Sequence, residues 1–340
     1  MRERTLTLRE LNRATLGRQL LLERRKLSPA GAIERLVGMQ AQWPPSPYIG
    51  LWTRIEGFRR ETLERLLRSG RVLKPTVMRG TLHLITTRDY PVFYAAFREM
   101  NTWFGPLHRE RAVGSADGVR ALLRNGRVDY REILAHLRGA HPDLQETDCR
   151  RMVYAVRRHA HLLHARETAA WTTRPAATFE AYDEPASVDA AVARTELVHR
   201  YLRAFGPAAR ADIAAWSGLR VRDFEHALDG LPTYRNEDGK TLYDTPRASL
   251  PPPDAPAPVR FLPKWDNVLL AFADRRRVLS DELRKRVIGK NGDVAATVLV
   301  DGAVAGTWSG AVRVELLVPL TRTQKAEVAD EAARLEAWLP

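Results

Sequence analysis

The chain has 340 residues, of which 44% are hydrophobic and 28% charged, and it contains one cysteine. This composition is ordinary for a globular protein, the length suits two or three compact domains, and one cysteine excludes an intrachain disulfide or a multi-cysteine zinc cluster. The net charge of +13 favours a polyanionic partner, nucleic acid first and an acidic membrane surface second. No apolar run reaches the roughly 18 residues of a membrane span, and no signal peptide is recognisable, so we expect a cytoplasmic protein with no membrane partner.

The first segment, residues 1–112, has patterns in the order of a winged-helix unit. Apolar residues recur at helical spacing, and a serine followed by proline is typical of a helix start. Two β-strands around Arg79-Gly80 follow the helices and would form the wing. The predicted helices cover 6–25, a stretch beginning at Ser28-Pro29, and 60–68, and the predicted strands cover 72–78 and 81–86.

A similar order recurs in two further segments, residues 113–190 and 191–245. The former is expected to contain helices over 130–137 and 146–163. The latter gives the clearest winged-helix pattern, because Asp238-Gly239 is a strong hairpin signal that follows several helices. Its predicted elements are helices over 195–205 and 211–216, a recognition-type helix over 221–228, and wing strands over 233–235 and 241–243.

Seven prolines make residues 246–263 a stiff connector rather than a helix or strand. The last segment, residues 264–340, is expected to hold a hairpin around Asp301-Gly302 and a terminal amphipathic helix over 326–339. The strands of this hairpin would cover 294–300 and 303–308. The fold class that follows is α+β and mainly helical, with tandem winged-helix units and a C-terminal β-hairpin region.

Two glutamines stand two residues apart in Gln40-Ala41-Gln42, directly after an apolar helical pattern. Trp43 precedes a proline, which biases it away from helix, and on an extended segment residues i and i+2 share a face. Both amides could therefore converge on one spot and hold a water or a polarised heterocycle, although a glutamine cannot act as a base. The alternative is that Gln40 and Gln42 only cap the helix end or bond local backbone.

Arg79, Thr81 and His83 lie at the first predicted hairpin, where Thr81 and His83 share one strand face. These three side chains could meet a nucleotide and its phosphate; the alternative is a structural turn with a satisfied histidine. The run of arginines and histidines over 157–164 lacks a completing carboxylate, so we expect a basic solvated face and no metal.

Trp265-Asp266-Asn267 follows the proline-rich connector, and Arg275, Arg276 and Arg277 come soon after. Three consecutive arginines cannot all face one way, but they can straddle a phosphate backbone; a solvated helix end is the alternative. The sequence does not place either Asp266 or Asp274 near the glutamines.

An ordered set of short motifs resembles one family over nearly the whole chain. Each motif is weak by itself, but their order is specific, and the chain resembles the AlkZ-like DNA glycosylases, also called the HTH_42 winged-helix family. The motifs are Leu20-Leu21-Leu22-Glu23-Arg24, Val37-Gly38-Met39-Gln40-Ala41-Gln42, Tyr48-Ile49-Gly50-Leu51-Trp52, Met78-Arg79-Gly80-Thr81-Leu82-His83-Leu84, Gly206-Pro207, Ala215-Trp216-Ser217-Gly218, Trp265-Asp266-Asn267, Val300-Asp301-Gly302 and Gly306-Thr307-Trp308.

The resemblance implies tandem winged helices in a C-shape around duplex DNA, and excision of alkylated or crosslinked purines by hydrolysis of the N-glycosidic bond. Gln40-Ala41-Gln42 matches the Gln-Φ-Gln branch, so Gln40 and Gln42 would be catalytic. We expect no cofactor and a monomer that acts on double-stranded DNA. The expected DNA contacts are Trp43, Arg79, Thr81, His83, Trp265, Asp266, Asn267, Arg275, Arg276 and Arg277.

Two non-enzymatic interpretations suit the same charge and winged helices. A transcriptional regulator would use the helix over 221–228 for recognition, prefer one DNA sequence and usually dimerise. A nucleic-acid scaffold protein would bind DNA without catalysis. A glycosylase differs from both because it binds with little sequence preference and releases a free base.

Overall fold

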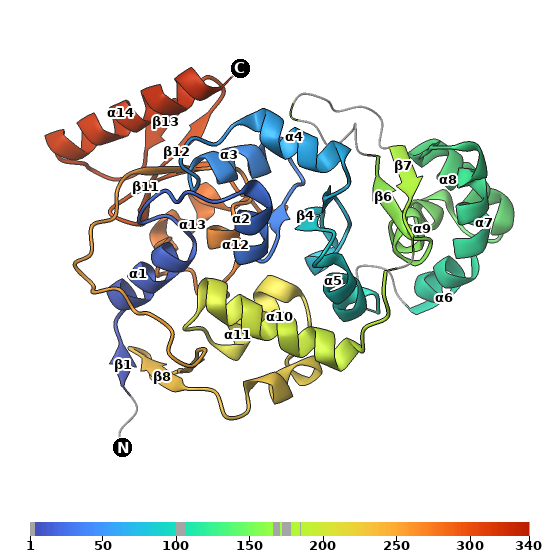
Figure 1. Ribbon diagram of the computed structural model, residues 1–340, viewed down its shortest axis with the longest axis horizontal. Coiled ribbons are helices and arrows are strands. Elements are labelled where there is room, and N and C mark those ends of the chain that lie inside the picture. The colour runs from blue at the N-terminus through green and yellow to red at the C-terminus, as the bar shows by residue number, and fades with distance from the viewer. Residues whose placement is uncertain (1–3, 100–105, 166–170, 172–177, 184, 340) are drawn as a thin grey trace.

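The computed structural model describes residues 4–99, 106–165, 171, 178–183 and 185–339. In this part of the chain, α-helices surround three three-stranded sheets and one four-stranded sheet. The first and last segments lie together in one body, and the helices around β6 and β7 form a lobe to one side (Figure 1). The α+β class predicted from the sequence is confirmed.

The α-helices of the described residues are α1 (Leu8–Arg18), α2 (Pro29–Arg35), α3 (Ser46–Trp52), α4 (Arg60–Arg68), α5 (Tyr90–Phe97), α6 (Pro106–Gly114), α7 (Ala116–Leu122), α8 (Tyr130–Ala140), α9 (Glu146–His159), α10 (Ala190–Phe205), α11 (Arg210–Ser217), α12 (Asn267–Leu270), α13 (Asp281–Val287) and α14 (Arg322–Trp338). The strands are β1 (Thr5–Leu6), β2 (Met39–Gln40), β3 (Val72–Leu73), β4 (His83–Thr86), β5 (Val128–Asp129), β6 (Leu162–His164), β7 (Thr178–Ala181), β8 (Thr233–Asn236), β9 (Thr241–Tyr243), β10 (Arg260–Leu262), β11 (Thr297–Val300), β12 (Ala303–Ser309) and β13 (Arg313–Leu316).

The first sheet has the order β2-β4-β3, and α1 to α4 precede or connect its strands. Ser28 caps α2 by accepting a hydrogen bond from the Gly31 amide, as predicted. Helix α1 is shorter than expected, because Leu20 takes a left-handed φ of 59° and the Leu21 amide bonds back to the Leu16 carbonyl. The two predicted strands are also shorter, since Met78–Gly80 forms a 3₁₀ turn between them.

The lobe contains the sheet β5-β7-β6 and helices α6 to α9 around a separate apolar core. Cys149 is buried in this core and is free. The prediction of a solvated basic face over 157–164 is wrong. Arg157 and His161 are buried, because α9 ends at His159 and the chain turns directly into β6.

In the third sheet, β1-β8-β9, the antiparallel pair β8–β9 confirms the predicted hairpin around Asp238-Gly239. The predicted recognition helix over 221–228 is wrong, since two short 3₁₀ segments, Val221–Asp223 and Glu225–Leu228, occupy it. Phe224 divides them with a φ of −144° because its side chain is completely buried. Strand β1 comes from the chain start and pairs in parallel with β8.

The C-terminal sheet has the order β10-β11-β12-β13, and the hairpin β11–β12 turns at Asp301-Gly302 as predicted. The last residues of the expected proline connector form β10, and α14 packs against this sheet. One apolar core joins Ile33 and Leu84 to Val298, so the first sheet and the C-terminal sheet are packed together. The domain boundaries and the C-shape remain predictions. Within the described residues, no helix has the length and apolarity to cross a membrane.

Candidate active site

Gln40 lies at the end of β2, where it faces His83 across the antiparallel pair β2–β4. The Ala41 amide continues the pairing with a hydrogen bond of 2.8 Å to the Leu82 carbonyl, and the chain then bends at Gln42 and Trp43. Gln40 is 7% exposed, whereas Gln42 is exposed and accepts a long hydrogen bond of 3.4 Å from the Leu82 amide. No hydrogen bond among the described residues links the two glutamines. Gln40 is fixed by its own contacts, whereas the side chain of Gln42 faces solvent.

The Gln40 amide is held by Arg79, which donates to Gln40 Oε1 at 2.8 Å and also donates to the backbone carbonyl of Trp216 at the end of α11. Arg79 stands at a left-handed φ of 52°. Gly218 has a φ of 80°, and a Cβ there would lie 3.3 Å from the Arg79 Cα and amide nitrogen, so another residue would be strained and would crowd Arg79. Because arginine only donates, the Gln40 oxygen must face it, and the Gln40 NH₂ is directed elsewhere.

Burial, with the charge of Arg275 added, lowers the pKa of Arg79 to about 10, so the guanidinium remains charged at neutral pH. An amide oxygen and a carbonyl oxygen satisfy it without neutralising its charge. Arg79 therefore places a net positive charge beside Gln40, which suits an anionic ligand such as a DNA phosphate.

His83 is completely buried, and its Nδ1 lies 3.0 Å from the Thr81 carbonyl oxygen. Burial and the charge of Arg79 lower the pKa of His83 to about 3, so the ring is neutral and Nδ1 carries the proton that Thr81 accepts. Thr81 in turn donates its hydroxyl to the Met78 carbonyl. These hydrogen bonds of His83 and Thr81 stabilise the turn that carries Arg79.

The Trp265-Asp266-Asn267 motif lies beneath the start of β2. Asn267 donates to the Gly38 carbonyl at 2.6 Å, two residues before Gln40. Asp266 caps α12 and receives two hydrogen bonds from buried Arg54, at 2.8 and 2.9 Å. The Trp265 indole donates to the Gly292 carbonyl. Asn267 thus positions the strand that carries Gln40, and Asp266 is held in a buried ion pair.

Trp43 is half-buried and packs against the core that joins the first sheet to the C-terminal sheet. Its carbonyl accepts the Ser46 amide, and the Ser46 hydroxyl donates to the Lys264 carbonyl at 2.7 Å. Trp43 therefore lies between Gln42 and the start of α3, with part of its ring left open to solvent.

The three consecutive arginines have three different environments. Arg277 is buried, donates to the Pro207 carbonyl and stacks on Phe272 at 4.0 Å. Arg276 is engaged by Asp274 and Asp238. Arg275 donates to the Leu269 carbonyl at 2.7 Å. These contacts assign Arg277 to packing and Arg276 to a local ion-pair network.

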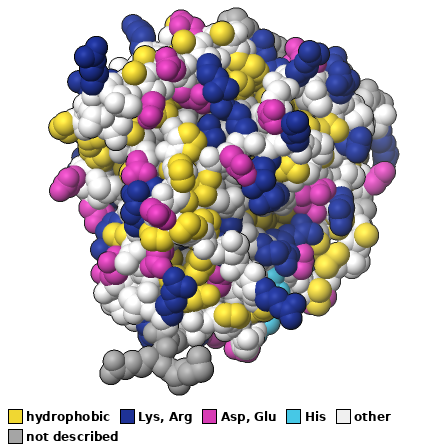
Figure 2. All heavy atoms as spheres, turned by 60° about the vertical axis from the view of Figure 1, so that its left-hand side comes forward, with side chains coloured by type: hydrophobic (Ala, Val, Ile, Leu, Met, Phe, Trp, Pro, Cys, Tyr) yellow, Lys and Arg dark blue, Asp and Glu magenta, His cyan; other side chains and the backbone are white. Residues whose placement is uncertain are grey.

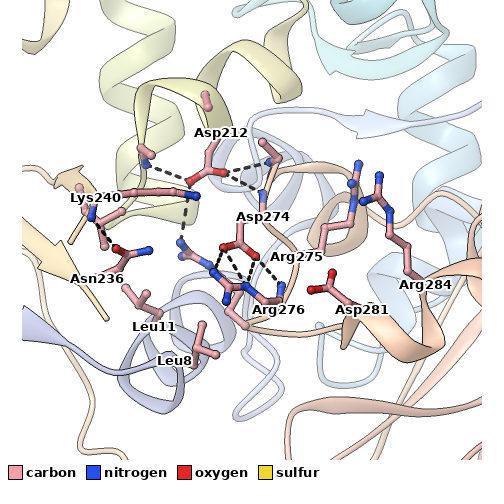
Figure 3. Close-up of a pocket in the computed structure, with 15 residues that line it drawn as sticks. Leu8, Leu11, Asp212, Asn236, Lys240, Asp274, Arg275, Arg276, Asp281 and Arg284 are labelled. Atoms are coloured by element: carbon pink, nitrogen blue, oxygen red, sulfur yellow. Dashed lines mark hydrogen bonds and ion pairs between the residues drawn. The ribbon is translucent and has the colours of Figure 1, made fainter. Parts of the chain in front are cut away.

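Arg275 and Arg284 lie alongside each other at the rim of a cavity of about 360 Å³ (Figure 3). Burial and the charge of Arg284 lower the pKa of Arg275. No carboxylate lies within ion-pair distance of Arg275 or Arg284 among the described residues. The charge of Arg275 also lowers the pKa of Arg79, so the positive charges of Arg275 and Arg79 lie near each other.

Sequence reasoning assigned no role to Arg54 or Arg284, and it named Trp216 and Gly218 only as part of the motif Ala215-Trp216-Ser217-Gly218. Ser217-Gly218 is recognisable as a turn. The contact of Arg79 with the Trp216 backbone carbonyl cannot be predicted, because any residue type could supply that carbonyl. Arg54 and Arg284 have no motif around them. No cluster of three or more potential metal ligands occurs in the described part of the chain.

Comparison with known proteins identifies the family. The family model described as DNA glycosylase AlkZ-like matches residues 33–338. The chain belongs to the AlkZ-like DNA glycosylase family. The Streptomyces sahachiroi DNA glycosylase AlkZ has a similar structure, with a TM-score of 0.77, 20% sequence identity and 97% of each chain covered. At this identity the structural likeness shows the shared fold. A sequence comparison with curated proteins found no significant match.

As a member of this family the protein is a DNA glycosylase, a hydrolase of N-glycosyl bonds, and its substrate is DNA. On the face shown in Figure 2, basic side chains are spread among acidic and apolar ones. Net charge by itself therefore does not locate the DNA interface.

Proposed function

We propose that the protein hydrolyses the N-glycosidic bond of cationic purines alkylated at N7 or N3 in duplex DNA, and that Gln40 and Gln42 orient the attacking water. The observation that carries this proposal is the contact between Arg79 and Gln40, because it fixes one amide of the Gln-Ala-Gln motif beside a positive charge. Gln42 lies two residues further along, where the chain bends, and its side chain is exposed. DNA that approaches this segment would meet both amides.

The reaction breaks the bond between C1′ and the purine nitrogen and forms a bond between C1′ and the water oxygen. The bonding electrons leave with the purine, whose positive charge they neutralise, and the attacking water releases a proton to solvent. The transition state resembles an oxocarbenium ion. The carbonyl dipole of the exposed Gln42 can face this cation. The Gln40 NH₂ group, which points away from Arg79, can donate a hydrogen bond to the water oxygen and orient it.

The neighbouring carboxylates favour a mechanism without a carboxylate base. Asp266 is paired with Arg54 and caps α12, and Asp274 is paired with Arg276. The burial of His83 keeps its ring neutral and places it away from proton transfer. A glutamine pair is a weaker catalyst than a carboxylate, but it suffices for a purine that already carries a positive charge. The proposed substrates are therefore cationic adducts, including bulky adducts and interstrand crosslinks, with little action on neutral lesions.

DNA binding in this proposal uses Arg79, Arg275 and Arg284 toward phosphates, and Trp43 toward a base or sugar near the glutamines. Neither glutamine lines the cavity beside Arg275, so this cavity would take a part of the DNA backbone and not the damaged base. Electrostatic binding of this kind weakens steeply with salt. We propose that the protein acts as a monomer.

A single-turnover assay tests the glutamines on duplex DNA that contains N7-methylguanine, with heat and alkali after the reaction to reveal abasic sites. We expect excision by the wild type, and a loss of at least tenfold in rate for Gln40→Ala and for Gln42→Ala, with nearly unchanged DNA affinity. Gln145→Ala, which changes an exposed glutamine of the lobe, serves as the matched control. Equal activity of the double variant and the wild type would contradict the assignment.

A further inference from the structure

Three basic side chains meet where the first sheet borders the lobe. Lys74 follows β3, Arg157 lies on the last turn of α9, and His164 ends β6. Lys74 and Arg157 are each 6% exposed, and His164 Nε2 is completely buried. The sequence pattern predicted a solvated basic face over 157–164, so the burial of these charges needs a physical reason.

Aromatic rings surround the Arg157 guanidinium. Its centre lies 4.9 Å from the Phe179 ring and 4.7 Å from the Tyr154 ring. His164 pairs with Phe179 across β6–β7, and its ring packs on Phe179 at 4.9 Å between centroids. The arginine and the histidine therefore both contact one phenylalanine and share an apolar wall.

Lys74 reaches the same junction from the first sheet. Its neighbour Leu73 belongs to the same apolar core as Leu163 of β6. Its other neighbour, Pro75, lines a small cavity of about 20 Å³ together with Arg157. Burial and the positive charges of Arg157 and Lys74 lower the pKa of His164 to about 3, so the histidine is neutral and adds no third charge.

These charges lack the acidic partners that buried cations usually have. The other buried arginines in the described residues each have a carboxylate within 4.0 Å: Arg13 with Asp301, Arg18 with Asp244, Arg54 with Asp266, Arg260 with Glu331 and Arg277 with Asp212. Arg157 and Lys74 make no ion pair or hydrogen bond with any described residue.

The charged ends of both side chains are nevertheless not completely enclosed. Arg157 Nε is fully buried without a partner, but neither the terminal nitrogens of Arg157 nor Lys74 Nζ is among the fully buried unsatisfied atoms. The stems are thus packed against apolar surface, and the cationic tips keep a small exposed area. Low-dielectric walls around exposed charge strengthen the attraction of an anion.

We propose that Lys74 and Arg157 form a binding site for a backbone phosphate of the DNA substrate at the border between the first sheet and the lobe. The site rests on the proposed function, since the DNA is the ligand. A phosphodiester supplies the negative charge and the acceptor oxygens that both tips lack. His164 lies close to both side chains and, because its ring is neutral, adds no further positive charge to their neighbourhood. A phosphate bound here would fix the lobe to the DNA strand.

The test measures affinity for undamaged duplex DNA as a function of salt in Lys74→Met and Arg157→Met, with Lys74→Arg as the charge-retaining variant. Lys325→Met on α14 and Arg131→Met on α8 remove the same charges from exposed positions and serve as controls. We expect each of the first two variants to bind more weakly and to lose about 0.9 from the slope of log K against log salt, the value for one phosphate contact. Lys74→Arg should keep the wild-type slope.

Thermal unfolding without DNA separates this role from a structural one. Neutral replacements of unpaired, largely buried cations are often harmless to stability, so both methionine variants should unfold at or above the wild-type temperature. Methionine variants that stay folded with the wild-type slope, or that change the slope no more than the controls do, would overturn the proposal. Variants that unfold at much lower temperature, with Lys74→Arg also losing DNA affinity, would overturn it in favour of a structural cluster.

Inorganic phosphate distinguishes the two sources of the anion. If phosphate raises the unfolding temperature of the wild type but the DNA salt slopes are unchanged in the variants, the site binds free phosphate and the DNA proposal is wrong. The excision assay of Gln40→Ala stays separate, because a catalytic failure there leaves the affinity and salt slope of Lys74→Met unaffected.

Discussion

Two groups of buried basic side chains near the first sheet differ in whether a carboxylate neutralises them. Near the glutamines, Arg54 is closed off by the carboxylate of Asp266, and both side chains are almost completely buried. At the border with the lobe, Lys74 and Arg157 are nearly as buried and have no acid among the described residues. The difference indicates that the ion pair of Arg54 with Asp266 stabilises the fold, whereas Lys74 and Arg157 can bind an anionic ligand.

Arg79 is intermediate between Arg54 and the two cations Lys74 and Arg157, because it has hydrogen-bond partners but no carboxylate partner among the described residues. Its nitrogens bond neutral oxygens of Gln40 and Trp216, so the arginine is held in place while its charge stays uncompensated. A fixed cation beside the glutamines can position an amide and attract a phosphate at once. Replacing such charges one at a time separates their structural role from their role toward DNA.

The largest effect on stability should come from breaking the buried ion pair between Arg54 and Asp266. Asp266→Ala leaves the Arg54 guanidinium buried without its carboxylate and removes the cap of α12, so we expect a loss of about 3–5 kcal/mol in the free energy of unfolding. Urea denaturation followed by circular dichroism measures this loss. Glu315→Ala, which breaks an exposed pair with Arg286, should cost no more than about 1 kcal/mol. Similar values for the two variants would show that burial does not decide the role of the Arg54 pair.

Arg79→Met should affect excision more than folding. Without the guanidinium, the Gln40 amide can rotate, and a misplaced catalytic group costs on the order of 100-fold in rate. Single-turnover excision of N7-methylguanine at saturating protein measures the rate apart from affinity. Arg88→Met, an exposed arginine on the same segment, is the control. An unchanged rate at saturation would mean that Arg79 only binds DNA.

A smaller, pH-dependent effect should distinguish Lys74 from ordinary surface lysines. Burial lowers the pKa of Lys74 to about 8, whereas Arg157 keeps its charge because its pKa is about 10. Between pH 7 and pH 9, Lys74 loses its proton, so DNA affinity should fall. The unfolded chain holds that proton up to a higher pH, so stability should rise with pH over the range between the folded and unfolded pKa values.

Comparison of the wild type with Lys74→Met checks both signs. The difference in DNA affinity between the two proteins should shrink as pH rises from 7 to 9, and the difference in unfolding free energy should shrink as well. A difference in affinity that is constant over this range would contradict a titrating Lys74 at the phosphate site.

Helix caps and hairpin turns were the parts of the fold that could be predicted from the sequence. Ser28 caps a helix, and Asp238-Gly239 and Asp301-Gly302 turn hairpins, because each of these signals acts over a few residues. The helix expected over 221–228 failed because burial of Phe224 overrides the helical spacing around it. Tertiary packing decides such short segments.

The site was predictable only as a set of residue types. Gln40, Arg79 and Asn267 were singled out before their contacts were known, and the structure brings Arg79 to Gln40 and Asn267 to the strand that carries it. The burial of Arg277 and the pairing of Arg276 could not be predicted, since both depend on segments far away in the sequence. Spacing along a chain does not tell an arginine that binds phosphate from one that packs on phenylalanine.

The position of α1 has a consequence for how the chain folds. Asn12 donates to the Gly302 carbonyl, 290 residues later, and Arg13 donates to the Asp301 carbonyl, 288 residues later. At synthesis rates of about 5–20 residues per second, the first helix would wait roughly 15–60 s for these partners. Contacts of such long range slow folding. The body that holds the glutamines therefore closes only when nearly the whole chain has been made, so an incomplete chain would lack an assembled catalytic segment.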